Sequence, residues 1–471
     1  MAEQTTAFKP TLSLLDATMI VAGSMIGSGI FIVSADILRH VGSSGWLIVV
    51  WLLTGFMTIT AAVSYGELSG MFPKAGGQYV YLKESYNPLI AFLYGWSFFA
   101  VIQTATIAAV AVAFAKFTAY LIPWFSEDLV AIDLGIFKIS HAQLLSVCII
   151  VLLTYINTRG TKTGKLIQTT FTLTKLLSLF GLIIFGLIMA KGDVWHANWT
   201  NAWSLHQLNK DGSIETYVTA AALGAMAAAM VGSIFSSDAW NNVTFIAAEI
   251  RNPKRNIGLS LFLGTLIVTI IYVTANVMYT AVLPLHEIAS ADKDRVAVAA
   301  SNAIFGGIGT KIIAIMIMIA TFGCDNGLIL SGARVYYTMA KDRLFFRQAG
   351  VLNDRAVPQF SLWMQCIFAC IWSFSGKYGD LLDMISFIVV VFYMLTIFGI
   401  FVLRRRNPNA ERPYKAFGYP VLPILYIIMG LGFCILLITF KRQYTWPGLI
   451  ITLLGLPLYY IAVANRKAEA T

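Results

Sequence analysis

Charged residues are scarce in this chain of 471 residues: they make up 12% of it, against 58% hydrophobic residues. No class of soluble globular protein tolerates that balance over such a length. Cysteine is also rare. The five cysteines all fall inside apolar stretches, so disulfides to a partner chain are not expected.

Motifs for enzyme chemistry are missing as well. No Walker loop is present, so ATP does not drive the protein directly. The five histidines are scattered without metal-ligand spacing. No nucleophile–base pair or cofactor motif is visible, so we expect neither an enzyme nor a bound metal or cofactor. The net charge of +10 follows from membrane topology and needs no nucleic-acid partner.

Long apolar stretches recur along almost the whole chain. A helix needs roughly 20 apolar residues to cross a bilayer. We therefore predict an all-α integral membrane protein with twelve transmembrane helices, near 12–37, 45–68, 88–122, 141–157, 166–190, 216–247, 258–283, 308–340, 359–375, 381–403, 420–440 and 447–464. No soluble domain fits between them.

The lysines and arginines indicate the orientation. If both termini are cytoplasmic, the inside segments hold twice as many of these residues as the outside loops. Such a bias is typical of cytoplasmic loops, so it predicts a multi-pass protein of the cell membrane with both ends inside.

Two spans contain residues that form poor membrane helices. The first is "AGSMIGSGIF" at 22–31, and the second is "MVGSIFSSDAWNN" at 230–242. The spacing of Gly23 and Gly27 alone fits close helix packing, but it leaves Ser28 and Gly29 unexplained. The two stretches lie at corresponding positions of two five-span blocks, which is the best sequence pointer to a transporter binding site.

Broken helices offer bare peptide dipoles at membrane depth. Freed amides at a half-helix N-terminus favour an anion, and freed carbonyls at a C-terminus favour a cation. We expect amides at Gly27 and Gly29 to bind a carboxylate, with a hydroxyl from Ser28. Carbonyls near Met25 and Phe235 would receive an ammonium group. A free α-amino acid carries both charges.

Several stretches go beyond this pattern. The segments "GSMIGSGIF" (23–31), "MFPKAGGQYVYLKESYNPLIAFLYGW" (71–96), "NPKRNI" (252–257) and "LRRRNPNAERPYKAFGYPVLPILY" (403–426) resemble the amino acid–polyamine–organocation superfamily. Within it they look most like the L-type amino acid transporter branch. The resemblance implies a LeuT-like fold, with a 5+5 inverted repeat, discontinuous helices 1 and 6, and two extra helices.

The resemblance also carries site residues over to this chain. It assigns Gly27, Ser28 and Gly29 to the carboxylate element, Met25 to the neighbouring carbonyl that accepts from the ammonium group, and Phe235 to an aromatic that closes over the substrate. Ser236 belongs to the same second break, and Asn326 matches a pocket-lining position. The chain departs from the family pattern at Ala239, where a glycine is usual, and segment 123–140 lacks the cysteine that joins a heavy chain in animal relatives. We therefore expect no disulfide-linked heavy chain.

Ionisable residues at membrane depth are functional hypotheses by default. Lys175 lies mid-span, where it could place its ammonium against the break of span 1 in the position of a structural sodium ion, or carry a proton; snorkelling is the plainer alternative. Asp238 could contact the substrate or cap a helix. Lys116 lies close enough to the outer surface to snorkel, and Glu67 and Glu249 are expected to pair with neighbouring basic residues.

These observations predict a secondary transporter that exchanges L-amino acids without sodium by alternating access. We expect a cytoplasmic tail at 1–11, a transport core at 12–403 with repeats at about 12–190 and 216–403, and helices 11 and 12 with a short tail at 404–471. Proton-coupled uptake of amino acids, or uptake of polyamines or amines, is the alternative that Asp238 would favour. A sensor that binds without transporting is a second alternative.

Overall fold

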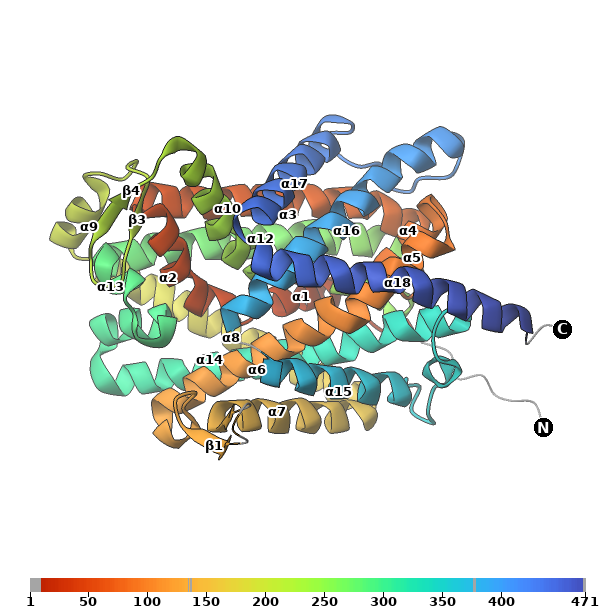
Figure 1. Cartoon of the computed structure of the whole chain (residues 1–471), viewed down its shortest axis with the longest axis horizontal. Helices are drawn as coiled ribbons and strands as arrows, with labels where there is room; N and C mark the ends of the chain where they lie inside the picture. Colours follow the sequence, from red (N-terminus) through yellow and green to blue (C-terminus); the bar gives the residue numbers. More distant parts are fainter. Residues whose placement is uncertain (1–9, 134, 136–137, 376–377, 469–471) are drawn as a thin grey trace.

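The computed structural model describes residues 10–133, 135, 138–375 and 378–468, which form a bundle of long helices (Figure 1). Among these residues, nine helices are long and apolar enough to cross a membrane, or ten if the bent pair Leu14–Met25 and Gly29–Val41 is one span. Two shorter apolar helices cover Ala221–Ser236 and Gln359–Phe374. A helical, multi-pass membrane protein is thus confirmed, while the count of twelve crossings stays a prediction.

The helices follow the predicted spans closely. They are α1 (Leu14–Met25), α2 (Gly29–Val41), α3 (Ser44–Met71), α4 (Gln78–Ser85), α5 (Pro88–Ser97), α6 (Gln103–Leu121), α7 (His141–Thr158), α8 (Thr161–Ile188), α9 (Gly192–Trp199), α10 (Thr219–Ser236), α11 (Asn242–Phe245), α12 (Pro253–Val282), α13 (Leu285–Ala289), α14 (Val296–Lys341), α15 (Gln359–Ser375), α16 (Tyr378–Arg406), α17 (Val421–Phe440) and α18 (Arg442–Ala468). Two short antiparallel hairpins, β1 (Val130–Asp133) with β2 (Lys138–Ser140) and β3 (His206–Leu208) with β4 (Ile214–Thr216), lie in loops.

Local sequence sets several helix starts. Ser13 caps α1 by accepting from the Asp16 amide, and the Asp16 side chain accepts from the Ser13 amide in return. Ser140 and Gln143 form the same kind of box at the start of α7. Asn87 caps α5, so these three helices begin where their sequences satisfy the free amides of the first turn.

Two predicted spans are less regular than expected. The span at 88–122 is α5 and α6 joined by a π-helical turn at Phe98–Ile102. The span at 308–340 is the C-terminal part of the longer α14, which kinks at Gly306 with φ of 69°. Glycine adopts this left-handed backbone at little cost, so the kink separates a short N-terminal segment of α14 from the predicted crossing.

The two ends of the bundle differ. Both chain termini lie at one end, and α9, α13 and the β3–β4 hairpin lie at the other (Figure 1). At the end with the termini, Glu249 pairs with Arg334 at 3.0 Å, and Glu67 pairs with Arg404 at 2.7 Å and Arg412 at 3.3 Å. The predicted ion pairs of Glu67 and Glu249 are therefore confirmed.

The interior positions the two interrupted helices against each other. The first half-helix, α1, packs on α12, α8 and α14, and the second, α2, packs on α10. Apolar side chains fill the space between them, and Met25, Ile26, Ile30, Phe235 and Tyr272 belong to one continuous buried cluster.

Candidate functional site at the helix breaks

The first break separates α1 from α2. Helix α1 ends at Met25, α2 begins at Gly29, and the two axes are bent by 44°. Helix α10 ends at Ser236, and the chain resumes as the short α11 at Asn242. Both interruptions lie within the weak stretches that the sequence marks, because glycine, serine and aspartate stabilise a helix interior poorly.

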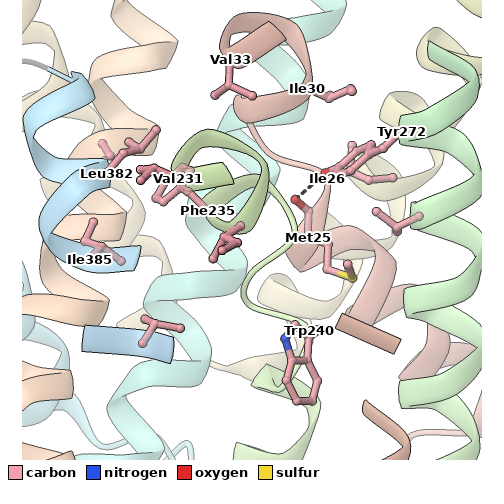
Figure 2. Packing of buried hydrophobic residues seen from close by; sticks show 14 of the residues in the cluster. Met25, Ile26, Ile30, Val33, Val231, Phe235, Trp240, Tyr272, Leu382 and Ile385 are labelled. Atoms are coloured by element: carbon pink, nitrogen blue, oxygen red, sulfur yellow. Dashed lines mark hydrogen bonds between the residues drawn. The ribbon is translucent and has the colours of Figure 1, made fainter. Parts of the chain in front are cut away.

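The two breaks touch. A Cβ atom at position 29 would lie 1.9 Å from Ser236 Oγ, so Gly29 packs directly against the end of α10. Tyr272 of α12 bridges the breaks: its hydroxyl lies 2.9 Å from the Met25 carbonyl oxygen, which accepts its hydrogen bond in Figure 2, and 3.1 Å from the Ser236 carbonyl oxygen. One buried tyrosine therefore holds both segments.

Side chains satisfy the carbonyls at the end of α1. The Lys175 ammonium donates to the Gly23 and Ile26 carbonyls, the latter at 2.8 Å. The Cys324 thiol donates to the Ser24 carbonyl at 3.3 Å. A cation therefore sits on the negative end of this half-helix, where the helix dipole favours positive charge.

The Met25 carbonyl is already engaged. It accepts from the Gly27 amide at 2.8 Å as well as from Tyr272. In this closed arrangement the predicted ammonium acceptor has two protein donors. A ligand can use it only after the break has rearranged.

The amides at the start of α2 face the other way. The first amides of a helix have no acceptor within it. In the part of the chain that the structure describes, no group accepts a hydrogen bond from the amides of Gly29 and Ile30. Ser28 is buried, and its Oγ lies 3.0 Å from the hydroxyl of Tyr378. This cluster offers N–H donors and two hydroxyls, which suit a carboxylate.

Two aromatic rings cover this region. Phe235, in the last turn of α10, packs edge-on against Tyr378, the first residue of α16, with ring centroids 6.1 Å apart. Both side chains are buried. Figure 2 shows Phe235 projecting from α10 within the apolar cluster that also contains Ile385 of α16.

Asp238 lies between two cavities. Both cavities are small, and Asp238 and Tyr393 line both. The Tyr393 hydroxyl donates to the Asp238 carboxylate at 2.5 Å. Asn241, and not Asp238, occupies the N-cap position of α11. The Asp238 carboxylate is bonded instead to a tyrosine of α16. The first cavity is rich in polar side chains, including Gln78, Gln103, Asn241 and Asn242.

Asn326 is bonded to a neighbouring helix. Its Oδ1 accepts from Asn157 Nδ2 of α7 at 2.8 Å, and its side chain is fully buried. Cys324, two residues earlier, contacts the break: a Cβ at Gly27 would lie 3.0 Å from its Sγ. Sequence reasoning missed Cys324, Tyr272 and Tyr378; a tyrosine hydroxyl deep in an apolar span was the available signal for Tyr272.

Comparison with known proteins identifies the family. Residues 12–462 match the model of the amino acid permease family. The chain is 30% identical to the serine/threonine exchanger SteT of Bacillus subtilis (strain 168), over 100% of both chains. It is 29% identical to the large neutral amino acids transporter small subunit 2 of Homo sapiens, over 97% of this chain and 81% of that one. It is 27% identical to the Asc-type amino acid transporter 1 of Mus musculus, over 99% and 83%.

The structure is a multi-pass bundle in which two broken helices touch. Together with these relatives, it defines a membrane transporter of amino acids, not an enzyme. The chain belongs to the amino acid permease family, within the amino acid–polyamine–organocation superfamily. The resemblance inferred from the sequence motifs is confirmed.

Proposed function

We propose that the chain exchanges L-amino acids across the membrane without sodium, by alternating access at the two helix breaks. The observation that carries this proposal is the contact between the breaks, with unpaired amides at the start of α2 and satisfied carbonyls at the end of α1. The name of the serine/threonine exchanger SteT supports exchange as the mode of transport.

The substrate would lie between α2 and the end of α10. Its carboxylate would bind the amides around Gly27 and Gly29 and the Ser28 hydroxyl, and its ammonium the carbonyls near Met25 and Phe235. Ser236 and Asp238 would line the pocket, and Phe235 would close it. Asn326 would line the pocket, with its side chain held by the bond to Asn157. Gly29 and Ser236 must move apart before an amino acid enters.

Lys175 supports independence from sodium. Its ammonium already donates to two carbonyls at the end of α1, so the charge that a metal cation would supply there is present in the chain. We therefore assign Lys175 a coupling role, in which its contacts stabilise one arrangement of the first break.

The wider arrangement proposed is the LeuT-like fold with twelve crossings. Repeats at about 12–190 and 216–403 would form the core, and α17 and α18 would be the two extra helices. The corresponding breaks after Met25 and Ser236 support this symmetry. We further propose that the protein lies in the cell membrane with both termini inside, and works without a disulfide-linked heavy chain. The absence of cysteine from the sequence at 123–140 supports the last point.

Proton-coupled or amine uptake is the second candidate. Asp238 favours it, because a buried carboxylate beside two cavities can attract a cationic group or carry a proton. This candidate predicts uptake into vesicles that contain no amino acid, driven by a proton gradient.

Counterflow separates the two candidates. Proteoliposomes preloaded with unlabelled L-serine should take up labelled L-serine faster than empty ones, at a rate that a sodium gradient leaves unchanged. Other L-amino acids should be screened in the same way, because the preferred substrate is open. Uptake that internal substrate does not stimulate, for every amino acid tested, would reject exchange.

A further inference from the structure

The two rings over the breaks form an outer lid, defined here as Phe235 and Tyr378. Helix α16 begins at Tyr378 and ends at Arg404–Arg406, at the same end of the bundle as the chain termini. Tyr378 therefore lies toward the opposite end, which is the outside in the proposed orientation. Its hydroxyl contacts Ser28 at 3.0 Å, so the lid rests directly on the carboxylate element.

Lys116 of α6 lies on this lid. Its Nζ is 5.5 Å from the centroid of the Tyr378 ring, and its side chain is partly buried. Sequence reasoning expected this lysine to snorkel to the outer surface. The structure instead directs its ammonium to the face of an aromatic ring, an arrangement attractive to a cation.

The backbone at Lys116 is fixed from a neighbouring loop. Arg295 Nη1 donates to the Lys116 carbonyl at 3.2 Å. The same guanidinium stacks over the ring of Tyr120, with its Cζ 5.3 Å from the ring centroid. These contacts hold the end of α6 and leave the Lys116 ammonium directed at the lid.

Nearby carboxylates are occupied by other cations. Asp294 pairs with Arg39 at 2.8 Å and with Lys210 at 3.7 Å. Asp383 pairs with Lys441 at 3.5 Å. Lys116 acts on Asp294 only as a weaker electrostatic neighbour. Among the described residues, no carboxylate forms an ion pair with Lys116, so Asp294 compensates its charge over the lid only in part.

We propose that Lys116 sets the charge selectivity of the outer gate, favouring amino acids without net positive charge. A substrate that approaches Ser28 and Gly29 from outside passes this ammonium when the lid opens. The ammonium attracts the substrate carboxylate and repels a cationic side chain. This inference rests on the proposed function and adds the substrate class to it.

Competition at the outer face tests the proposal in intact cells, where the sidedness is defined. The probe is a labelled neutral amino acid that the wild type exchanges, with external L-arginine and the unlabelled neutral amino acid as competitors. Lys116→Gln should lower the ratio of the apparent inhibition constants, arginine over neutral, by about tenfold. Lys116→Arg keeps the charge and should keep the wild-type ratio.

Lys191→Gln is the matched control, because it removes an exposed lysine from the same end of the bundle. It should leave the ratio unchanged. A second measurement needs no variant: raising the ionic strength should lower the wild-type ratio, since salt screens exposed charge. That result keeps the test decisive if Lys116→Gln does not reach the membrane.

The possible outcomes distinguish a failure of the Lys116 proposal from a failure of the proposed function. If exchange persists and neither Lys116→Gln nor high salt changes the ratio, Lys116 does not select by charge, while the proposed function stands. If the wild type exchanges no amino acid, the proposed function fails and this inference fails with it.

Discussion

At position 29 the packing of the two breaks leaves room for a hydrogen atom and nothing larger. Ser236 Oγ and Cβ would lie 1.9 Å and 2.6 Å from an added Cβ. No described residue accepts from the Gly29 amide, so both the small size and the backbone of this residue serve the site. The site therefore requires a residue without a side chain at position 29.

Gly29→Ala should lower amino acid affinity and exchange by about fivefold or more, because overpacking a filled contact costs about 1–3 kcal/mol. Gly181→Ala is the control. A Cβ there meets nothing within 4 Å, so exchange should be unchanged. Counterflow by both variants checks this; wild-type exchange by Gly29→Ala would contradict the site.

Lys175→Met should abolish most exchange. The substitution leaves the Gly23 and Ile26 carbonyls without their donor, and an unsatisfied buried group costs about 1–3 kcal/mol. Removing a buried charge acts in the opposite direction on stability, so transport is the decisive measurement. Lys138→Met, on the β1–β2 hairpin, should exchange normally. Equal activity of the two variants would show that Lys175 has no coupling role.

At the scale of elements, the breaks were predictable and the rotations of the helices were not. Glycine and serine clusters weaken a helix wherever it lies, so the ends of α1 and α10 follow from composition alone. Which neighbour a helical side chain meets depends on packing. Packing thus brings Asn326 to Asn157 of α7 and Lys116 to a ring of α16. The sequence alone indicated a pocket-lining position for Asn326 and a position near the outer surface for Lys116.

Tyr272→Phe tests the link between the two breaks. Losing the hydroxyl removes a donor from the Met25 and Ser236 carbonyls and should lower stability by about 1 kcal/mol. Because both breaks rearrange on binding, apparent substrate affinity should change severalfold. Tyr86→Phe loses a comparable bond, 2.7 Å to the Leu395 carbonyl, and should leave affinity unchanged. Thermal unfolding and competition binding give the two quantities.

At the scale of the whole molecule, ion pairs close the structure at both ends. Arg39 pairs with Asp294 at one end at 2.8 Å, and Arg334 pairs with Glu249 at the other at 3.0 Å. Alternating access requires that one end opens while the other stays closed. Each pair is therefore expected to stabilise closure of its own end.

In the proposed orientation, Glu249→Gln should open the inner end more often. Cys324 contacts the first break, so in a variant that retains it as the sole cysteine, its thiol should react faster with an impermeant reagent applied from inside. Glu411→Gln, which breaks an exposed pair with Lys254 at 3.1 Å, is the control. Equal labelling rates would show that the Glu249–Arg334 pair does not control closure of this end.

The most direct test of the central claim is ligand-induced thermal stabilisation of the purified protein. The claim is that the two breaks bind both charged ends of a free amino acid. A preferred L-amino acid should raise the melting temperature, because it binds the native state. Its decarboxylated amine and its deaminated acid should each raise it far less at the same concentration. An amine that stabilises the protein as well as the parent amino acid would contradict the claim.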